Sequence, residues 1–148
     1  MKQITLAQCI AQVESSGNKL AQRFEPRIYA STGYKTQTEI CQYAVCGYID
    51  NTSAAVIAAT SWGMYQIMGY NLYDFGYKGT IFQFQGSETL QGQYLIAFFR
   101  KNIPLVNPMK IFNQLTDEEI MQVGDIYNGN GPAYSASLKQ AFQTLSSQ

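Results

Sequence analysis

Apolar residues recur at helical spacing from the start of the chain. Four of them occupy positions i, i+3, i+4 and i+7 and so share one side of a helix: Leu6, Cys9, Ile10 and Val13. Thr5 followed by Gln8 three residues later has the pattern of a capping box, which begins a helix, and Gly17 is suited to end one. The sequence therefore predicts an amphipathic helix that starts after Thr5 and stops at Gly17.

Most of the later segments also carry helix signals. The predicted helices are a short one over residues 38–48, a short one over 53–59, one that Ser87 caps and that ends before Pro104, a short one over 108–115, one over 117–127 that opens with the capping box of Thr116 and Glu119, and a last one from near Pro132 to Leu145. Residues 18–33 predict a loop with one helical turn. Residues 61–76 are dense in glycine and aromatic residues and predict a tight turn that leads into a short helix.

Few stretches alternate between apolar and polar residues with the period of two that strands need. The chain has 148 residues, of which 46% are hydrophobic, so it has the length and the apolar content for one well-formed core. It has no internal repeat, low-complexity tract or linker-like segment. We therefore expect a single, mainly α domain over residues 1–148, with about seven to eight helices and little or no β structure.

The charge balance narrows the choice of partners. Ten Lys and Arg offset ten Asp and Glu, and charged residues make up only 14% of the chain. Such a chain has no overall field that would attract a polyanion, so neither nucleic acid nor a membrane is an expected partner. Eleven Tyr and eight Phe suit a neutral, hydroxyl-rich ligand such as a glycan, although a tyrosine-rich core would explain them equally well.

The absence of histidine removes several kinds of chemistry at once. Ser-His-Asp and Cys-His catalysis, His-ligated zinc and imidazole acid–base catalysis all need a residue that this chain lacks. Cys9, Cys41 and Cys46 have no CxxC spacing and are interpreted as small core residues, with any disulfide between them left open. No phosphate-binding loop, dinucleotide fingerprint or calcium loop is present, so no cofactor or metal is expected. Among the common catalytic groups, the carboxyl groups of Asp and Glu are those that remain for this chain.

Three segments combine glycines with polar and aromatic residues in a way that a plain scaffold would not need: 13–18, 61–71 and 127–131. Glu14 belongs to the first of them. It lies in the last turn of the predicted first helix and follows Ile10 by four residues, so its carboxyl group should lie at the edge of the core. Partial burial of this kind raises the pKa of a carboxyl group.

The order of these segments resembles a known superfamily. Glu14-Ser15 at a helix end, then Gly63-Met64-Tyr65-Gln66-Ile67, then Tyr127-Asn128-Gly129 is similar to the lysozyme-like proteins, which include soluble lytic transglycosylases and goose-type lysozymes. Phe24-Glu25-Pro26, the run from Ala59 to Asn71 and Phe75-Gly76-Tyr77 resemble more closely the N-acetylmuramidase domain of bacteriophage endolysins. The resemblance covers roughly residues 5–142. It implies a lysozyme-like fold around a glycan-binding cleft.

The resemblance also implies an activity and roles for individual residues. The reaction would be cleavage of the β-1,4 bond between N-acetylmuramic acid and N-acetylglucosamine in peptidoglycan, with Glu14 as the catalytic acid. A glycosidic oxygen leaves readily only when it is protonated, so the acid must keep its proton near neutral pH. By matching position, the sugar subsites would be lined by Gln66 with Met64 and Tyr65, and Glu14 would be faced by Tyr127 and Asn128. Trp62 could equally be a buried anchor or a sugar-stacking ring.

The need for a second carboxylate is open at this stage. An inverting hydrolase places two carboxyl groups about 6.5–9.5 Å apart, and Glu25 is the first candidate for the second one, with Asp125 in reserve. Arg23 and Arg27 flank Glu25, so it could instead belong to a structural ion pair. Related lytic transglycosylases use a single Glu and yield 1,6-anhydromuramoyl products, which is the alternative activity.

Two hypotheses without catalysis are also compatible with the fold: a glycan-binding module and a structural protein of a virion. The presence of Glu14 favours the enzyme. The start of the chain lacks the pattern of a signal peptide, and no stretch reaches 18 apolar residues. We expect a monomeric lysis enzyme that accumulates in the host bacterial cytoplasm and reaches the cell wall after the membrane is opened.

Overall fold

The computed structural model describes residues 2–31 and 50–148, and these parts of the chain are mainly helical. Their α-helices are α1 (Leu6–Ser15), α2 (Pro26–Ala30), α4 (Asn51–Ala58), α5 (Gly69–Asp74), α6 (Ile81–Gly86), α7 (Glu88–Asn102), α8 (Asp117–Tyr127) and α9 (Gly131–Ser146). A short 3-10 helix, η1, spans Phe112–Gln114. The prediction of a mainly α fold is confirmed.

The local signals that predicted the helices are seen as hydrogen bonds. The Thr5 hydroxyl accepts from the backbone N–H of Gln8, and the Gln8 side chain accepts from the Thr5 N–H in return, so the first capping box closes as expected. Thr116 and Glu119 form the same arrangement at the start of α8. At its other end, α1 stops because Ser16 and Gly17 both take left-handed backbone angles, with φ of 54° and 78°.

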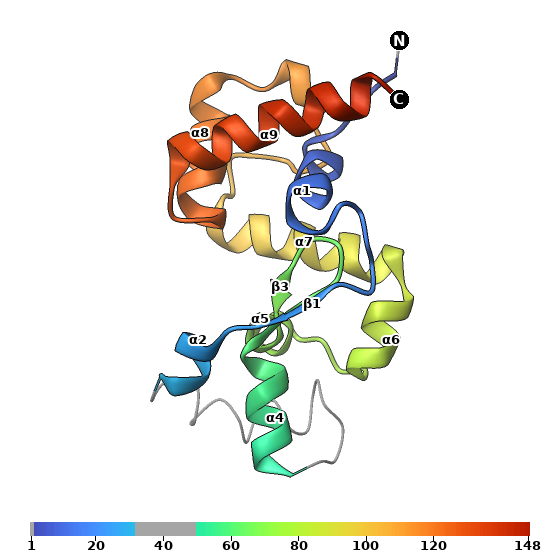
Figure 1. Ribbon diagram of the computed structural model, residues 1–148, viewed down its shortest axis with the longest axis vertical. Coiled ribbons are helices and arrows are strands. Elements are labelled where there is room, and N and C mark those ends of the chain that lie inside the picture. The colour runs from blue at the N-terminus through green and yellow to red at the C-terminus, as the bar shows by residue number, and fades with distance from the viewer. Residues whose placement is uncertain (1, 32–49) are drawn as a thin grey trace.

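The helices are arranged around α7. Figure 1 shows α1, α8 and α9 together at one end of the molecule, and the strands with α2, α4 and α5 at the other, while α7 runs between them. Helix α9 packs against both α8 and α1, and α6 packs against α7. This packing brings the C-terminal end of α1, where Glu14 lies, next to the first turn of α9.

The β structure of the described residues is one small antiparallel sheet. Its strands are β1 (Gln22–Phe24), β2 (Thr60–Trp62) and β3 (Ile67–Met68), in that order across the sheet. Arg23 is opposite Ser61, and Trp62 is opposite Ile67. The segment predicted as a loop with one helical turn, residues 18–33, is described up to residue 31, and that part contains strand β1 as well as helix α2. Strands of two or three residues are too short to give an alternating sequence pattern, so only the structure shows their pairing.

Two other expectations need correction. Residues 108–115 contain η1 instead of an α-helix, and α6 was not expected at all, although Thr80 and Gln83 form a third capping box at its start. The helix predicted over residues 38–48 lies outside the described residues. Among the helices that are described, none combines the length and the apolar character needed to cross a membrane.

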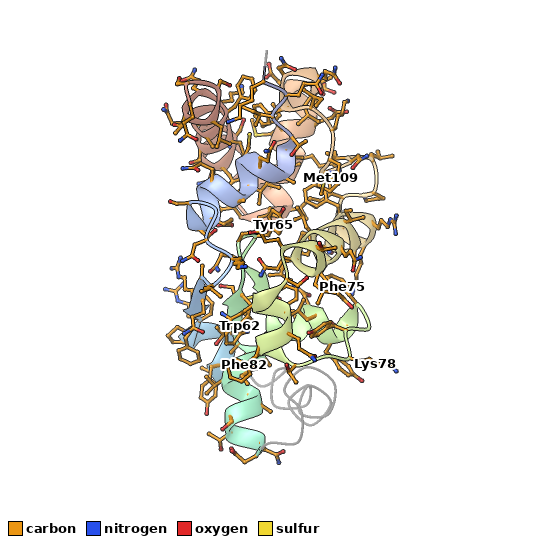
Figure 2. All side chains as sticks on the ribbon, turned by 90° about the vertical axis from the view of Figure 1, so that its right-hand side faces the viewer. Trp62, Tyr65, Phe75, Lys78, Phe82 and Met109 are labelled. Atoms are coloured by element: carbon orange, nitrogen blue, oxygen red, sulfur yellow. The ribbon has the colours of Figure 1, made fainter. Side chains whose placement is uncertain are left out.

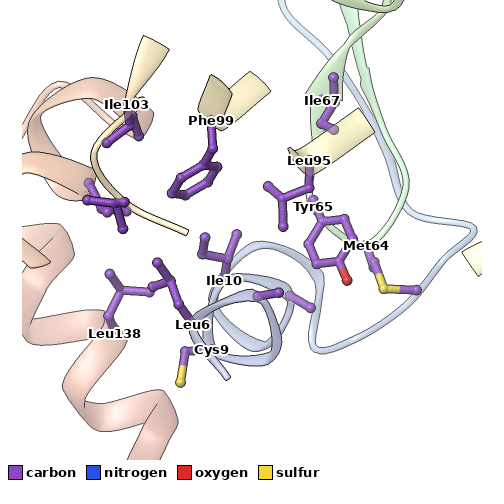
Figure 3. Close-up of a cluster of buried hydrophobic side chains, with 14 of the residues drawn as sticks. Leu6, Cys9, Ile10, Met64, Tyr65, Ile67, Leu95, Phe99, Ile103 and Leu138 are labelled. Carbon is purple, nitrogen blue, oxygen red and sulfur yellow. The ribbon is translucent and has the colours of Figure 1, made fainter. Parts of the chain in front are cut away.

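The core is built around the apolar side of α1. Figure 3 shows Leu6 and Ile10 of α1 among Leu95 and Phe99 of α7 and Leu138 of α9, and all five side chains are fully buried or nearly so. Cys9 is buried in the same cluster, as expected of a small core residue, and burial raises the pKa of its thiol to about 12. Cys41 and Cys46 lie outside the described residues.

Candidate active site

Glu14 lies in the last turn of α1, at the edge of the core. Its side chain is half-buried, while Ile10, one turn earlier, is fully buried. The next residue, Ser15, fixes the helix end in space because its hydroxyl donates to the backbone carbonyl of Met64, at 2.8 Å. The position predicted from the helical spacing is thus the observed one.

Tyr134 is the side chain that contacts the Glu14 carboxyl group. Its hydroxyl donates to Oε1 of Glu14 at 3.3 Å, and only 4% of the residue is exposed. Helix α9 can present Tyr134 here because Asn130 caps the helix and Pro132 occupies its first turn. In the sequence, Tyr134 stands out only as one residue on the apolar side of the last predicted helix. A tyrosine on such a side places a polar tip at the far edge of the core, and that was the signal available.

Tyr127 stacks on Tyr134, with the ring centroids 5.9 Å apart and the ring planes at 29°. Its hydroxyl donates to the backbone carbonyl of Tyr65. Burial, followed by the proximity of Tyr134, Glu14 and Tyr65, raises the pKa of Tyr127 well above its ordinary value. The two tyrosines therefore form a stacked pair beside Glu14. The Tyr134 hydroxyl donates to the Glu14 carboxyl group, and the Tyr127 hydroxyl donates to the backbone at Tyr65.

The surroundings of Glu14 favour its neutral form. Burial raises its pKa, and this effect exceeds two opposing ones: the hydrogen bond from Tyr134 and the positive charge of Arg23. Both opposing effects stabilise the carboxylate. Glu14 therefore keeps its proton to a higher pH than an exposed glutamate does, and a hydrogen-bond donor is already in place for the carboxylate that remains once the proton is given away.

The residues predicted to line sugar subsites belong to a tight turn, residues 63–66, that connects β2 to β3. Gly63 and Gln66 take left-handed angles there, with φ of 81° and 52°. Met64 and Tyr65 are 8% and 9% exposed, so little of either side chain is available to a ligand. Their backbone carbonyls are the groups that hold Ser15 and Tyr127.

Gln66 is half-buried at the end of this turn and carries two internal hydrogen bonds. Its Oε1 accepts from the Ser61 hydroxyl and its Nε2 donates to the Gly63 carbonyl, both at 2.9 Å. An amide has two N–H groups and two oxygen lone pairs, so one of each is left for a ligand. The structure thus gives Gln66 a role in shaping the turn, alongside the predicted contact with sugar.

Glu25 follows β1 and directly precedes Pro26. Its Oε1 lies 3.3 Å from Nε of Arg23, in the ion pair that the flanking arginines made possible. Arg23 also acts on Glu14 through its charge, so one guanidinium group links the electrostatics of the two carboxyl groups. The reserve candidate, Asp125, accepts a hydrogen bond from the Gly131 N–H at 2.9 Å and so helps to hold the turn before α9.

Asn128 and Trp62 have very different exposures. Asn128 is the exposed C-cap residue of α8, directly after Tyr127. Trp62 is 8% exposed, and its indole N–H donates to the Ile57 carbonyl at 3.0 Å, which fits the interpretation as a buried anchor. Figure 2 shows Trp62 beside Phe82, and both lie nearer than Tyr65 to the end of the molecule that holds α4.

The described residues offer no ready metal site. In residues 2–31 and 50–148, no three Cys, Asp or Glu side chains gather closely enough to hold an ion. What these residues do bring together is a half-buried carboxyl group with a raised pKa and a hydroxyl donor on that carboxyl group, under the influence of the charge of Arg23.

Comparison with known proteins finds a matching family and a similar phage endolysin. The sequence profile of the N-acetylmuramidase family matches residues 22–146, a range that begins after Glu14. The endolysin of Enterobacteria phage PRD1 is 30% identical over 146 residues, which cover 95% of this chain and 96% of that protein. No solved structure matched significantly.

Proposed function

Because the chain belongs to the N-acetylmuramidase family and is a peptidoglycan-cleaving muramidase of the endolysin kind, we propose that Glu14 is the general acid of its reaction. The bond broken is the β-1,4 link between N-acetylmuramic acid and N-acetylglucosamine. The observation that carries the proposal is a half-buried Glu14 with a raised pKa in contact with the Tyr134 hydroxyl.

The proposed first step is transfer of the Glu14 proton to the oxygen of the glycosidic bond. As that bond breaks, the leaving sugar takes the proton and positive charge develops on the sugar ring that remains. Glu14 becomes a carboxylate in a partly buried position, which is unfavourable unless the charge is stabilised. The Tyr134 hydroxyl donates to that carboxylate, and the charge of Arg23 also favours it.

Glu25 is the proposed second carboxylate, and it would activate the water that completes hydrolysis. Support comes from its place next to Arg23, whose charge also reaches Glu14, and from its partial exposure, 32% for the side chain, which leaves it open to water.

The proposed substrate contacts differ in kind. Gln66 has a free N–H and a free lone pair for acetamido or hydroxyl groups, and Asn128 is exposed on the loop that leads to α9. The contribution of Met64 and Tyr65 comes mainly from the shape of the turn, since both side chains are nearly buried. Tyr127 contributes through its stacking on Tyr134 and its proximity to Glu14.

The setting in which the enzyme works is also part of the proposal. The similar phage PRD1 protein is an endolysin, and we place this chain in the same role: a monomer that is made in the host cytoplasm and acts on the cell wall once the membrane has been opened. Peptidoglycan is its substrate, and no partner is invoked beyond it.

Glu14→Gln tests the assignment of the acid. The amide keeps the shape and can still accept from Tyr134, but it has no proton to give, so we expect the lysis of purified cell walls to fall by roughly 10²- to 10⁴-fold. Glu118→Gln, on the exposed first turn of α8, is the matched control and should lyse walls normally. Mass spectrometry of the digest by the native enzyme should show reducing-end muropeptides, because the proposed reaction consumes water. Full lysis by Glu14→Gln would refute the assignment.

A further inference from the structure

Gln91 is a buried polar residue in α7 that does not contact Glu14. It is 0% exposed, and its amide makes four hydrogen bonds. Oε1 accepts from the Met64 N–H at 2.8 Å, and Nε2 lies within 3.1–3.2 Å of the carbonyls of Lys19, Phe84 and Gln85. A buried amide is unfavourable unless it is hydrogen-bonded, and this one is fully used.

These hydrogen bonds join three segments that are far apart in the sequence. Lys19 lies in the segment that leads from α1 to β1, Met64 lies in the 63–66 turn, and Phe84 and Gln85 lie at the end of α6. Gln91 is thus the point in α7 where the chain after Glu14, the turn and α6 all meet.

The 63–66 turn connects Gln91 to the groups around Glu14. The Met64 carbonyl accepts from the hydroxyl of Ser15, the neighbour of Glu14, and the Tyr65 carbonyl accepts from the hydroxyl of Tyr127, which stacks on Tyr134. Met64 therefore contacts Gln91 through its N–H and Ser15 through its carbonyl, and the next residue, Tyr65, contacts Tyr127 through its carbonyl. A shift of the turn would move Ser15 and Tyr127 with it.

Gly63 shows how closely the turn lies on the Gln91 amide. A Cβ at position 63 would be 2.6 Å from Oε1 of Gln91, which is closer than Cβ atoms approach their neighbours in real proteins. The φ of 81° also favours glycine. The Gly63 N–H donates to the Ala21 carbonyl at 2.8 Å, which ties the turn a second time to the segment after α1. The position of the turn is therefore set by direct contact with the amide.

We propose that Gln91 is a positioning residue for Glu14, which acts through the 63–66 turn and through Ser15 and Tyr127 without touching the substrate. The inference rests on the proposed role of Glu14. In physical terms, the Gln91 amide holds the 63–66 turn in place, and the turn in that position keeps the Glu14 carboxyl group half-buried and within reach of Tyr134.

The pH dependence of activity should report this positioning. Within the described residues, the titratable or charged groups that act on Glu14 are Tyr134 from α9, Tyr127 from α8 and Arg23 from β1. If the turn loosens, water gains access to the carboxyl group, and the desolvation that raises the pKa of Glu14 is reduced. The basic limb of the pH profile then moves to lower pH.

Gln91→Met is the test, because methionine has a similar length and makes none of the four hydrogen bonds. We expect kcat on purified cell walls, corrected for the folded fraction, to fall about tenfold or more, and the basic limb to move to lower pH. Phe112→Leu is the matched control: Phe112 is 4% exposed and stacks on Phe142, so the change weakens the core away from Glu14. It should lower the free energy of unfolding but leave the pH profile in place.

Ser15→Ala is the second variant, and it keeps the test decisive if Gln91→Met does not fold. It removes the link from α1 to the Met64 carbonyl, together with a longer contact of the same hydroxyl with the Ala11 carbonyl at 3.2 Å within α1. It should move the basic limb in the same direction. Unshifted pH profiles in Ser15→Ala, and in Gln91→Met where that variant folds, would overturn the proposal. Glu14→Gln belongs in the same series, since its activity bears on the acid itself: an inactive Glu14→Gln beside unshifted profiles refutes the role of Gln91 alone.

Discussion

The Tyr134 hydroxyl lies 3.3 Å from Oε1 of Glu14, although the two residues are 120 positions apart in the sequence. The contact joins the last turn of α1 to the first turn of α9. A hydroxyl can donate to a carboxylate more strongly than to a neutral carboxyl group, so this contact is worth most after the proton has left Glu14. The same hydrogen bond lowers the pKa of Glu14 against the larger effect of burial.

Tyr134→Phe should therefore raise the pKa of Glu14 further. With the hydrogen bond gone, burial is opposed only by the charge of Arg23, and the basic limb of kcat/KM on cell walls moves to higher pH. The maximal rate should also fall, because the carboxylate loses its donor. A pH–rate profile from about pH 4 to 9 gives both quantities.

Tyr77→Phe is a matched control for that experiment. Tyr77 is 5% exposed, and its hydroxyl donates to the Thr80 carbonyl at 2.6 Å, so this variant also removes one hydrogen bond of a buried tyrosine. Equal pH profiles for the two variants would show that the hydroxyl of Tyr134 does not act on Glu14.

Glu25→Gln compared with Arg23→Gln tests the second carboxylate. Both changes break the same ion pair, which joins partly exposed groups and should be worth about 0–1 kcal/mol in stability. Only Glu25→Gln removes a general base, so its rate of wall lysis should fall by about 10² or more, while Arg23→Gln should retain most of the activity.

Arg23→Gln should also move the basic limb of the pH profile upward, because Arg23 lowers the pKa of Glu14. If the two variants lose activity to the same small extent, Glu25 is only a structural partner of Arg23. Hydrolysis would then need another source of activated water.

The raised pKa of Glu14 also predicts how stability depends on pH. Below its ordinary value of 4.5, Glu14 is protonated in both the folded and the unfolded chain, and its contribution to stability is fully present. As the pH rises, Glu14 ionises first in the unfolded chain, which binds fewer protons than the folded one. The free energy of unfolding therefore falls between pH 4.5 and the higher pKa of the folded state.

Urea unfolding of the native chain and of Glu14→Gln at several pH values measures this effect. The native chain should lose stability relative to the variant as the pH rises above 4.5. Asp50 and Glu119, whose pKa values are lowered by hydrogen bonds, titrate at lower pH in both proteins and cancel in the difference. A difference that stays constant with pH would mean that Glu14 has an ordinary pKa.

The parts of the fold that were predicted from the sequence depend on local interactions. A capping box such as Thr5 with Gln8 lies within one helical turn, and so does the spacing that places Glu14 next to Ile10. The helix that starts at Asp117 and the one that starts near Pro132 were found in the same way. In each case the residues that form the interaction are neighbours in the sequence.

The parts that were missed depend on which elements pack together. Tyr134 contacts Glu14 only because α9 packs against α1. Gln91 contacts Met64 only because the 63–66 turn, which follows β2, lies against α7. Neither residue has a motif around it, and strands of two or three residues have no sequence pattern of their own. Helix α6 differs from these cases, because the capping box of Thr80 with Gln83 at its start is a local signal that the sequence carries.

The contact between α1 and α9 also affects when the enzyme gains its activity during folding. A partly folded chain in which α9 has not yet docked contains Glu14 but lacks Tyr134 beside it and part of the apolar surroundings that raise its pKa. Its carboxyl group would be hydrated, and its pKa would be closer to that of a glutamate in a short peptide. The surroundings of the acid are therefore complete only once the last helix has docked.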